Sequence, residues 1–181
     1  MKTFEDLIKN RRSTRQYTEE KLLPEQVEKI MKAPLMAPSS KNSRPCEFIL
    51  IEDKEMLRLL SLCRPTGASH LEQCALGIVV LSDIVRSSAH IEDASIAATY
   101  IQLQAEDIDL GSCWIQISGR ETEDGYESEQ YVRDLLNIPL QLSVVCIIAV
   151  GHKVKQNKPH NEGKLEWEKL HIEKYRPYEQ E

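Results

Sequence analysis

The segment from Ile91 to Leu110 carries the clearest periodic pattern in this chain of 181 residues. Apolar side chains recur along it at alternating spacings of three and four, at Ile91, Ala94, Ala98, Ile101, Ala105 and Ile108. This spacing predicts an α-helix with one apolar face. Because most of these side chains are small, another helix can approach the face closely, either inside one core or across a dimer interface. Gly111 follows at the place where a helix C-cap is expected.

Helical and extended patterns alternate along the rest of the chain, but without the regularity of repeated βαβ units. Helices are expected at 2–10, 54–63 and 128–136, and another begins at Pro24 and weakens before Pro34. Strands are expected at 47–51, 75–81, 112–117 and 142–150, of which the second and fourth are apolar enough for burial on both faces. The polar tail from Lys153 to Glu181 is expected to wrap over another surface, with a helix around 164–174. Four strands with five or six helices indicate an α+β or mixed α/β class.

Composition limits the class of protein. Lys and Arg total 23 against 29 Asp and Glu, which leaves a net charge of −6, whereas dedicated nucleic-acid binders usually carry a basic excess. The apolar runs are far shorter than the roughly 20 residues that cross a bilayer, and the N-terminus lacks a signal-peptide core. We therefore expect one cytoplasmic domain over residues 1–181, with no nucleic-acid or membrane partner. The five cysteines are expected to be free thiols in a reducing compartment.

Familiar catalytic signatures are absent from the sequence. It contains no dinucleotide-binding glycine motif, P-loop, zinc-protease motif, EF-hand loop or serine nucleophile elbow. His90-Ile91-Glu92 matches half of a zinc-deaminase signature, but the cysteine pair of the other half is missing. We therefore expect no metal site, and no cysteine is singled out as a nucleophile by its neighbours.

Three segments carry polar groups that suit ligand binding. Arg11-Arg12-Ser13-Thr14-Arg15 places three guanidinium groups and two hydroxyls within five residues, which suits phosphate, although cations also complement a helix C-terminus. Residues 37–45 form a loop of small donors and acceptors that can bond either to the backbone or to a polar ligand. Residues 109–116 predict a helix end followed by a strand that carries Trp114, either as a core aromatic or beside a ligand.

The order and spacing of these segments resemble the FMN-dependent nitroreductase family. R-R-S-x-R lies near the N-terminus, A-P-S-S-x-N-x-x-P follows about 25 residues later, and L-G-S-C-W-I follows the long helix. The resemblance extends through G-H-K of the last strand into the tail, and it is closest to short, single-domain bacterial members. It implies a three-layer α+β fold, with a central, mostly antiparallel sheet surrounded by helices and the long helix at a dimer interface.

The same resemblance implies a homodimer that binds FMN in clefts between its subunits. The residues implied to contact FMN are Arg11, Arg12, Ser13, Arg15, Pro38, Ser39, Ser40, Asn42, Ile115, Gln116, Lys158 and His160. The first four, with the two tail residues, would hold the phosphate, ribityl chain and pyrimidine edge, and the loop residues would come from the opposite subunit. The backbone at Ile115 and Gln116 would run along the reactive edge of the ring. No catalytic side chain is implied, because FMN supplies the chemistry.

The implied activity is reduction of nitroaromatics, quinones or similar acceptors by NADH or NADPH, in a ping-pong reaction with hydride transfer through flavin N5. Two alternatives stay open: another flavin reaction on the same fold, such as dehydrogenation, dehalogenation or flavin fragmentation, and a low-turnover flavin-binding or redox-sensing protein. Arg44, Cys46 and Gln116 depart from the common family pattern beside the expected pocket. Arg44 is expected either to favour an anionic substrate or to form a surface ion pair.

Overall fold

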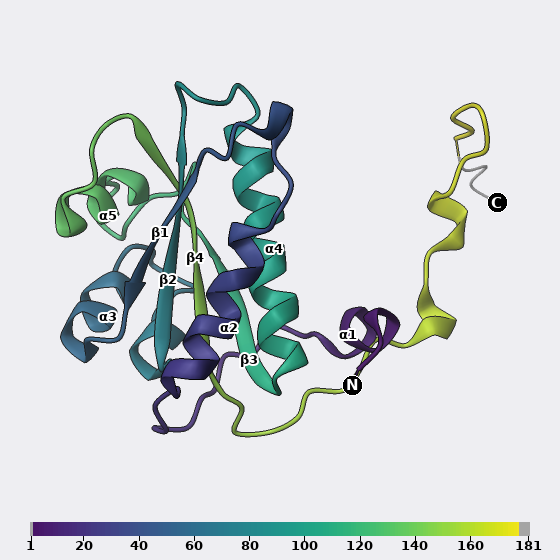
Figure 1. Ribbon diagram of the computed structural model, residues 1–181, viewed down its shortest axis with the longest axis horizontal. Coiled ribbons are helices and arrows are strands. Elements are labelled where there is room, and N and C mark those ends of the chain that lie inside the picture. The colour runs from purple at the N-terminus through teal and green to yellow at the C-terminus, as the bar shows by residue number, and fades with distance from the viewer. Residues whose placement is uncertain (1, 178–181) are drawn as a thin grey trace.

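The computed structural model describes residues 2–177, and its centre is a four-stranded sheet in the order β1-β2-β4-β3 (Figure 1). The strands are β1 (Cys46–Ile51), β2 (Leu76–Asp83), β3 (Leu110–Gln116) and β4 (Leu142–His152). Every neighbouring pair is antiparallel. β2 and β4 lie in the middle and are buried almost throughout, as their apolar runs predict. This leaves β1 and β3 as the two edges of the sheet.

Five α-helices lie within the described residues: α1 (Phe4–Asn10), α2 (Pro24–Leu35), α3 (Lys54–Ser61), α4 (His90–Asp107) and α5 (Ser128–Leu136). α2 and α4 cover one face of the sheet, where Ile30 and Ile101 share a core cluster with Ile148. α3 and α5 cover the other face, where Leu57 and Val132 belong to a second cluster. These three layers confirm the predicted α+β fold with a central antiparallel sheet. None of the helices in residues 2–177 is long and apolar enough to cross a membrane.

The small-residue face of α4 packs on the sheet of its own chain. Ala94, Ala98, Ile101 and Ala105 are all fully buried there, so of the two uses that the sequence allowed, this face serves the chain's own core. The outer face of α4 is also partly apolar, with Ile96 and Tyr100 each 38 % exposed. That outer face is the part of α4 that can meet a second molecule.

Gly111 is not the predicted helix cap. α4 ends at Asp107, and the left-handed turn that follows is made by Asp109 with a φ of 63°. Gly111 lies inside β3, where a Cβ would approach the side chain of Thr14 to 2.6 Å. Thr14 comes this close because its N–H donates to the carbonyl of Ser112 at 2.9 Å. Glycine is therefore needed for the approach of the N-terminal segment to the edge strand.

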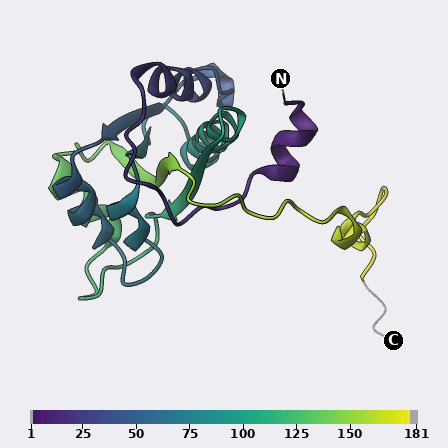
Figure 2. The same cartoon turned by 90° about the horizontal axis from the view of Figure 1, so that it is seen from below.

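Two helix predictions differ from the structure. α2 continues through Pro34 to Leu35, because Ala33 and Pro34 are buried and their packing outweighs the lost backbone hydrogen bond. The expected helix at 164–174 is absent, and the described tail holds only single 3-10 turns at Glu162–Lys164 and Trp167–Lys169. Its apolar side chains are exposed, so nothing packs on an amphipathic face to stabilise a short helix. The tail instead extends away from the body of the molecule (Figures 1 and 2).

All five cysteines lie in the described residues and are unpaired thiols, as predicted. Four are buried and Cys46 is half-buried. Burial raises the pKa of Cys46 to about 11 and the pKa values of Cys63 and Cys74 to about 12. Because the thiolate is the reactive form, these three thiols are inert near neutral pH. This weighs against the redox-sensing alternative.

Candidate functional site

The arginine-rich segment and the start of the tail lie against each other at the edge of β3. Arg12 Nη1 donates to the carbonyl of Lys158 at 2.8 Å, and the N–H of His160 donates to the carbonyl of Lys9 at 2.9 Å. Ser13 forms a parallel bridge with Ser112 of β3. Residues that the sequence separates by almost 150 positions thus meet at one place.

The cations of this cluster have no carboxylate partners. Within residues 2–177, no carboxylate lies within 4.0 Å of the charged nitrogens of Arg11, Arg12, Arg15 or Lys158. The acidic side chains nearby are used elsewhere, since Glu162 pairs with Lys9 and Glu106 pairs with Lys153. These two adjoining segments thus carry four unpaired cations and the Ser13 hydroxyl in a chain of net charge −6, and groups of this kind suit a phosphate.

β3 presents a free edge beside this cluster. Thr14 bonds to the carbonyl of Ser112, so the backbone groups of Ser112 face away from β4. Along an antiparallel pair, the backbone N–H and C=O of successive residues point alternately toward and away from the neighbouring strand. The N–H of Gln116 therefore faces outward like that of Ser112, whereas the N–H of Ile115 faces β4. Of the two residues that the sequence analysis named here, only Gln116 offers its backbone N–H to a ligand at this edge.

The side chains of the same two residues are engaged within the protein. Ile115 is fully buried in the core. The side-chain amide of Gln116 accepts from Trp114 Nε1 and donates to the carbonyl of Ser118, both at 2.9 Å. These bonds fix the strand end and leave the backbone as the part of Gln116 that faces outward.

The serine-rich loop is held in a strained conformation at the start of α4. Lys41, Asn42 and Arg44 have φ values of 52°, 54° and 48°, which non-glycine residues rarely adopt. The N–H of Ser40 donates to Oδ1 of Asp93 at 2.7 Å, and Asp93 is only 3 % exposed. This buried carboxylate holds the loop in one shape on the first turn of α4.

The loop residues line a small cavity of about 280 Å³ that includes Pro38, Ser39, Arg44 and Cys46. Arg44 does not form the expected surface ion pair: its Nε donates to Asn42 Oδ1 at 3.1 Å, and no carboxylate among the described residues lies within ion-pair distance. This hydrogen bond holds the Arg44 side chain against its own loop. Arg44 therefore adds a cation to this part of the surface.

Within one chain, the arginine cluster and the serine-rich loop lie far apart. The loop bonds to Asp93 near the start of α4, whereas Lys153 and Lys2, which border the arginine cluster, bond to Glu106 near its end. At 1.5 Å per residue, these two points on the helix are about 20 Å apart. Figure 1 shows the same separation, with α1 and the tail at the opposite end of α4 from the loop.

Two functional candidates were missed by the sequence analysis, because no local motif marks them. Arg64 reaches the edge of β3, where its Nη1 lies 3.5 Å from the carbonyl oxygen of Gln116. His70 is buried beside the arginine cluster, and its Nε2 has no hydrogen-bond partner among the described residues. Burial and the charge of Arg15 lower the pKa of His70 to about 4. The imidazole is therefore neutral near pH 7 and adds no charge to the site.

The lowered pKa of His70 should make the stability of the fold depend on pH. In the unfolded chain the imidazole takes up a proton near pH 6.5, but in the folded chain only near pH 4. The unfolded state therefore binds the extra proton between these values, and stability is lost as pH falls through this window. We expect urea unfolding to show a loss of roughly 2–3 kcal/mol from this group between pH 7 and pH 4. The His70→Leu variant should lack that component, and equal slopes in the two proteins would contradict the assignment.

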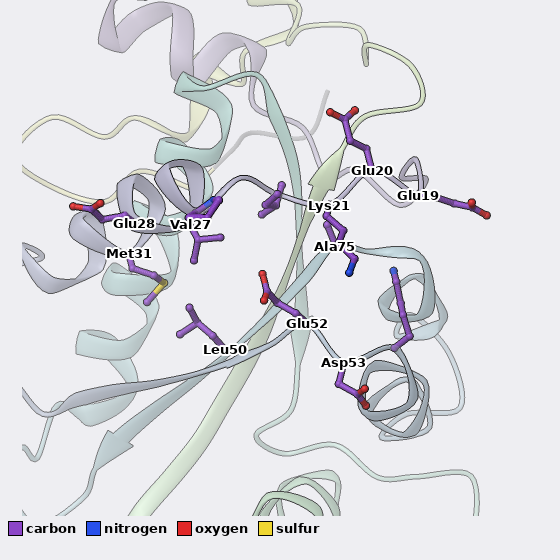
Figure 3. Close-up of a pocket in the computed structure, with 13 residues that line it drawn as sticks. Glu19, Glu20, Lys21, Val27, Glu28, Met31, Leu50, Glu52, Asp53 and Ala75 are labelled. Atoms are coloured by element: carbon purple, nitrogen blue, oxygen red, sulfur yellow. The ribbon is translucent and has the colours of Figure 1, made fainter.

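A larger groove lies away from these clusters, between α2 and the end of β1 (Figure 3). It has a volume of about 940 Å³ and contains none of the predicted site residues. Its rim carries the carboxylates of Glu19, Glu20, Glu28, Glu52 and Asp53, and its floor is apolar, with Leu22, Val27, Met31 and Leu50. These five carboxylates outnumber the two lysines of the lining, Lys21 and Lys54, so the groove would repel a phosphate and is not the counterpart of the arginine cluster.

Comparisons with known proteins all point to one family. The model described as "Nitroreductase family" matches residues 8–76 and 64–152. An Archaeoglobus fulgidus protein whose name includes "NADH dehydrogenase/NAD(P)H nitroreductase" is 31 % identical over 174 residues, covering 93 % of this chain and 97 % of the relative.

Solved structures agree with this match. An FMN-dependent nitroreductase from Clostridium difficile is 44 % identical, with a TM-score of 0.91 over 93 % of this chain and 98 % of the other. A Desulfovibrio desulfuricans structure, named as a nitroreductase in complex with FMN, is 25 % identical with a TM-score of 0.77 over 97 % and 99 % of the two chains. The likeness covers both the arginine segment and the edge strand.

Proposed function

Because this chain belongs to the nitroreductase family, we propose that it is an FMN-dependent oxidoreductase that uses NADH or NADPH to reduce nitroaromatics, quinones or similar acceptors. The observation that carries the proposal is the cluster of four unpaired cations next to the free edge of β3. The FMN-dependent relative at 44 % identity supports the choice of cofactor, and the name of the Archaeoglobus relative supports the choice of electron donor.

The residues present fit FMN by their chemistry. Arg11, Arg12, Arg15 and Lys158 would neutralise the phosphate dianion, with the Ser13 hydroxyl as a further donor. The outward N–H of Gln116 would donate to the ring and hold it in one orientation against the strand. His160 lies one residue beyond Pro159 in the same tail segment and would border the phosphate.

Bound FMN would supply hydride acceptance and donation at its N5 position. Each turnover oxidises one NAD(P)H and gives the acceptor two electrons and two protons, one of the protons from solvent. For a nitro group, the products are the nitroso compound and water. Both substrates would use the same face of the ring, so NAD(P)H must leave before the acceptor enters, which gives ping-pong kinetics. No side chain is assigned an obligatory acid or base role, because FMN would supply the chemistry.

We propose that the working unit is a homodimer, because the two clusters lie about 20 Å apart in one chain. A two-fold arrangement with antiparallel α4 helices would bring the arginine cluster of one chain to the Ser39–Asn42 loop of the other. Ile96 and Tyr100 on the outer face of α4 support this, as do Phe4 and Ile8 of α1, which are 68 % and 49 % exposed. Such a site draws on both chains.

The tail would wrap the partner in this dimer. In the tail, Trp167, Leu170 and Ile172 are 67 %, 68 % and 82 % exposed. The groove between α2 and β1 has an apolar floor that none of the residues from 2 to 177 covers. We assign the groove as the surface on which the partner's tail lies, because both surfaces are apolar and exposed in a single chain.

The visible spectrum of the purified protein tests the proposed function. We expect flavin absorbance in the protein as isolated or after addition of FMN, and bleaching by NADH or NADPH without oxygen. Reoxidation by a nitroaromatic or quinone should then restore the spectrum. A protein that binds no flavin would contradict the proposal, and bound flavin that neither nicotinamide reduces would favour a different flavin reaction on the same fold.

A further inference from the structure

Arg64 brings a guanidinium group to the part of β3 that is proposed to face the flavin ring. Its Nη1 lies 3.5 Å from the carbonyl oxygen of Gln116, and its side chain is half-buried. The carbonyl and the N–H of Gln116 leave the sheet on the same edge. Ser112, where the arginine cluster begins, is four strand positions away, or about 13 Å. Arg64 is therefore a separate cation, at the ring end of the site and not at its phosphate end.

The turn that carries Arg64 is fixed by its neighbours. Ser128 Oγ donates to the carbonyl of Cys63 at 2.6 Å, which ties the residue before Arg64 to α5. Pro65 restricts the backbone of Arg64 from the other side. Gly67 has a φ of 84°, and a Cβ there would lie 3.8 Å from Arg64 Nη1, so the turn folds back beside the guanidinium. The position of the charge is set by the protein before any ligand binds.

Arg64 has no carboxylate partner within 4.0 Å among residues 2–177. Glu72, Glu123 and Asp124 line a cavity of about 470 Å³ beside it, but Glu72 accepts from Ser61 Oγ at 3.0 Å and none of the three pairs with Arg64. One of the five N–H donors of the guanidinium reaches Gln116. The others suit a carboxylate, which arginine binds through two parallel hydrogen bonds.

We propose that Arg64 is the anion-recognition residue of the substrate site, and that the acceptor reduced by this protein carries a carboxylate or similar acidic group on its ring. This rests on the proposed function. An acceptor that reacts beside Gln116 places a ring substituent within reach of Arg64. The phosphates of a nicotinamide cofactor lie farther from the reacting carbon, beyond a ribose, so the nearer anion is that of the acceptor.

The test compares 4-nitrobenzoate with 4-nitrobenzamide, which have nearly the same shape and differ in charge. The Arg64→Gln variant should raise the KM for 4-nitrobenzoate by about 10- to 100-fold, the range for a lost charge-assisted bond. The KM for 4-nitrobenzamide should change less than about twofold, and Arg64→Lys should recover part of the difference. Arg58→Gln is the matched control, since it removes the same charge from a solvent-exposed pair with Glu55 on α3.

A binding measurement separates Arg64 from turnover. Benzoate and benzamide can be titrated into the oxidised FMN-loaded protein while the visible flavin band is recorded. Arg64→Gln should weaken benzoate binding but leave benzamide binding and FMN affinity unchanged, because the phosphate cluster lies elsewhere. Equal losses for both compounds, or a rise in KM for NADH alone, would overturn the assignment. If the wild type reduces neither nitro compound, the proposed activity fails, while the benzoate titration still decides the role of Arg64.

Discussion

Replacing Arg15 by alanine should weaken FMN binding by about 1.5–3 kcal/mol, the range for a hydrogen bond to a charged group, or roughly 10- to 150-fold in Kd. The effect is expected to be large because Arg15 is one of four cations with no carboxylate partner, so nothing within the described chain takes over its charge. Flavin fluorescence or calorimetric titration of the apoprotein measures it directly.

Two controls make the Arg15 result specific. Arg58→Ala removes the same charge from an exposed pair with Glu55 on α3, on the face of the sheet opposite α4, and should leave the Kd for FMN unchanged. Arg15→Lys should retain part of the affinity, because it keeps the charge but loses the planar donor set. The charge of Arg15 also lowers the pKa of His70, so Arg15→Ala should raise that pKa toward its ordinary value in an NMR titration. Unchanged FMN affinity in Arg15→Ala would show that this cluster is not the phosphate site.

The full-length dimer has a mass of about 42 kDa, twice the 20.8 kDa of one chain, and deleting residues 163–181 should convert it into a monomer lighter than 20.8 kDa. The truncated chain keeps every predicted FMN residue, including Lys158 and His160. It should nevertheless lose FMN affinity, because the Ser39–Asn42 loop would no longer reach the site of the other chain. Light scattering coupled to gel filtration gives the mass, and FMN titration of the same fractions gives the affinity.

A point variant tests the same contact without removing the tail. Trp167 is 67 % exposed in the single chain, so Trp167→Ser should weaken the dimer with little effect on the fold of the monomer. Glu166→Gln changes a neighbouring side chain that pairs with Lys169 within the tail, and should leave the dimer intact. A truncated protein that remains dimeric with full FMN affinity would refute the role of the tail.

The layers of the fold could be predicted because they follow from hydrophobic periodicity. The apolar runs in β2 and β4 and the spacing in α4 depend on neighbouring residues, so they are visible in the chain itself. The predictions that were wrong concerned features that long-range contacts, or their absence, decide. The helix at 164–174 requires something for Leu165 and Leu170 to pack on. Of the two alternatives for Arg44, the ion pair requires a carboxylate that the folded loop does not bring near.

The sequence by itself determined the elements of the sheet and marked the proposed phosphate donors near residue 12, because local periodicity and side-chain chemistry decide both. Only the tertiary structure decided which backbone amide of β3 faces outward, since that direction depends on the pairing of β3 with β4 and with Thr14. The tertiary structure also decided why position 111 needs a glycine, since a Cβ there would meet the side chain of Thr14. The separation of the two clusters and the approach of Arg64 to Gln116 are long-range distances, and only the packing of the layers sets them.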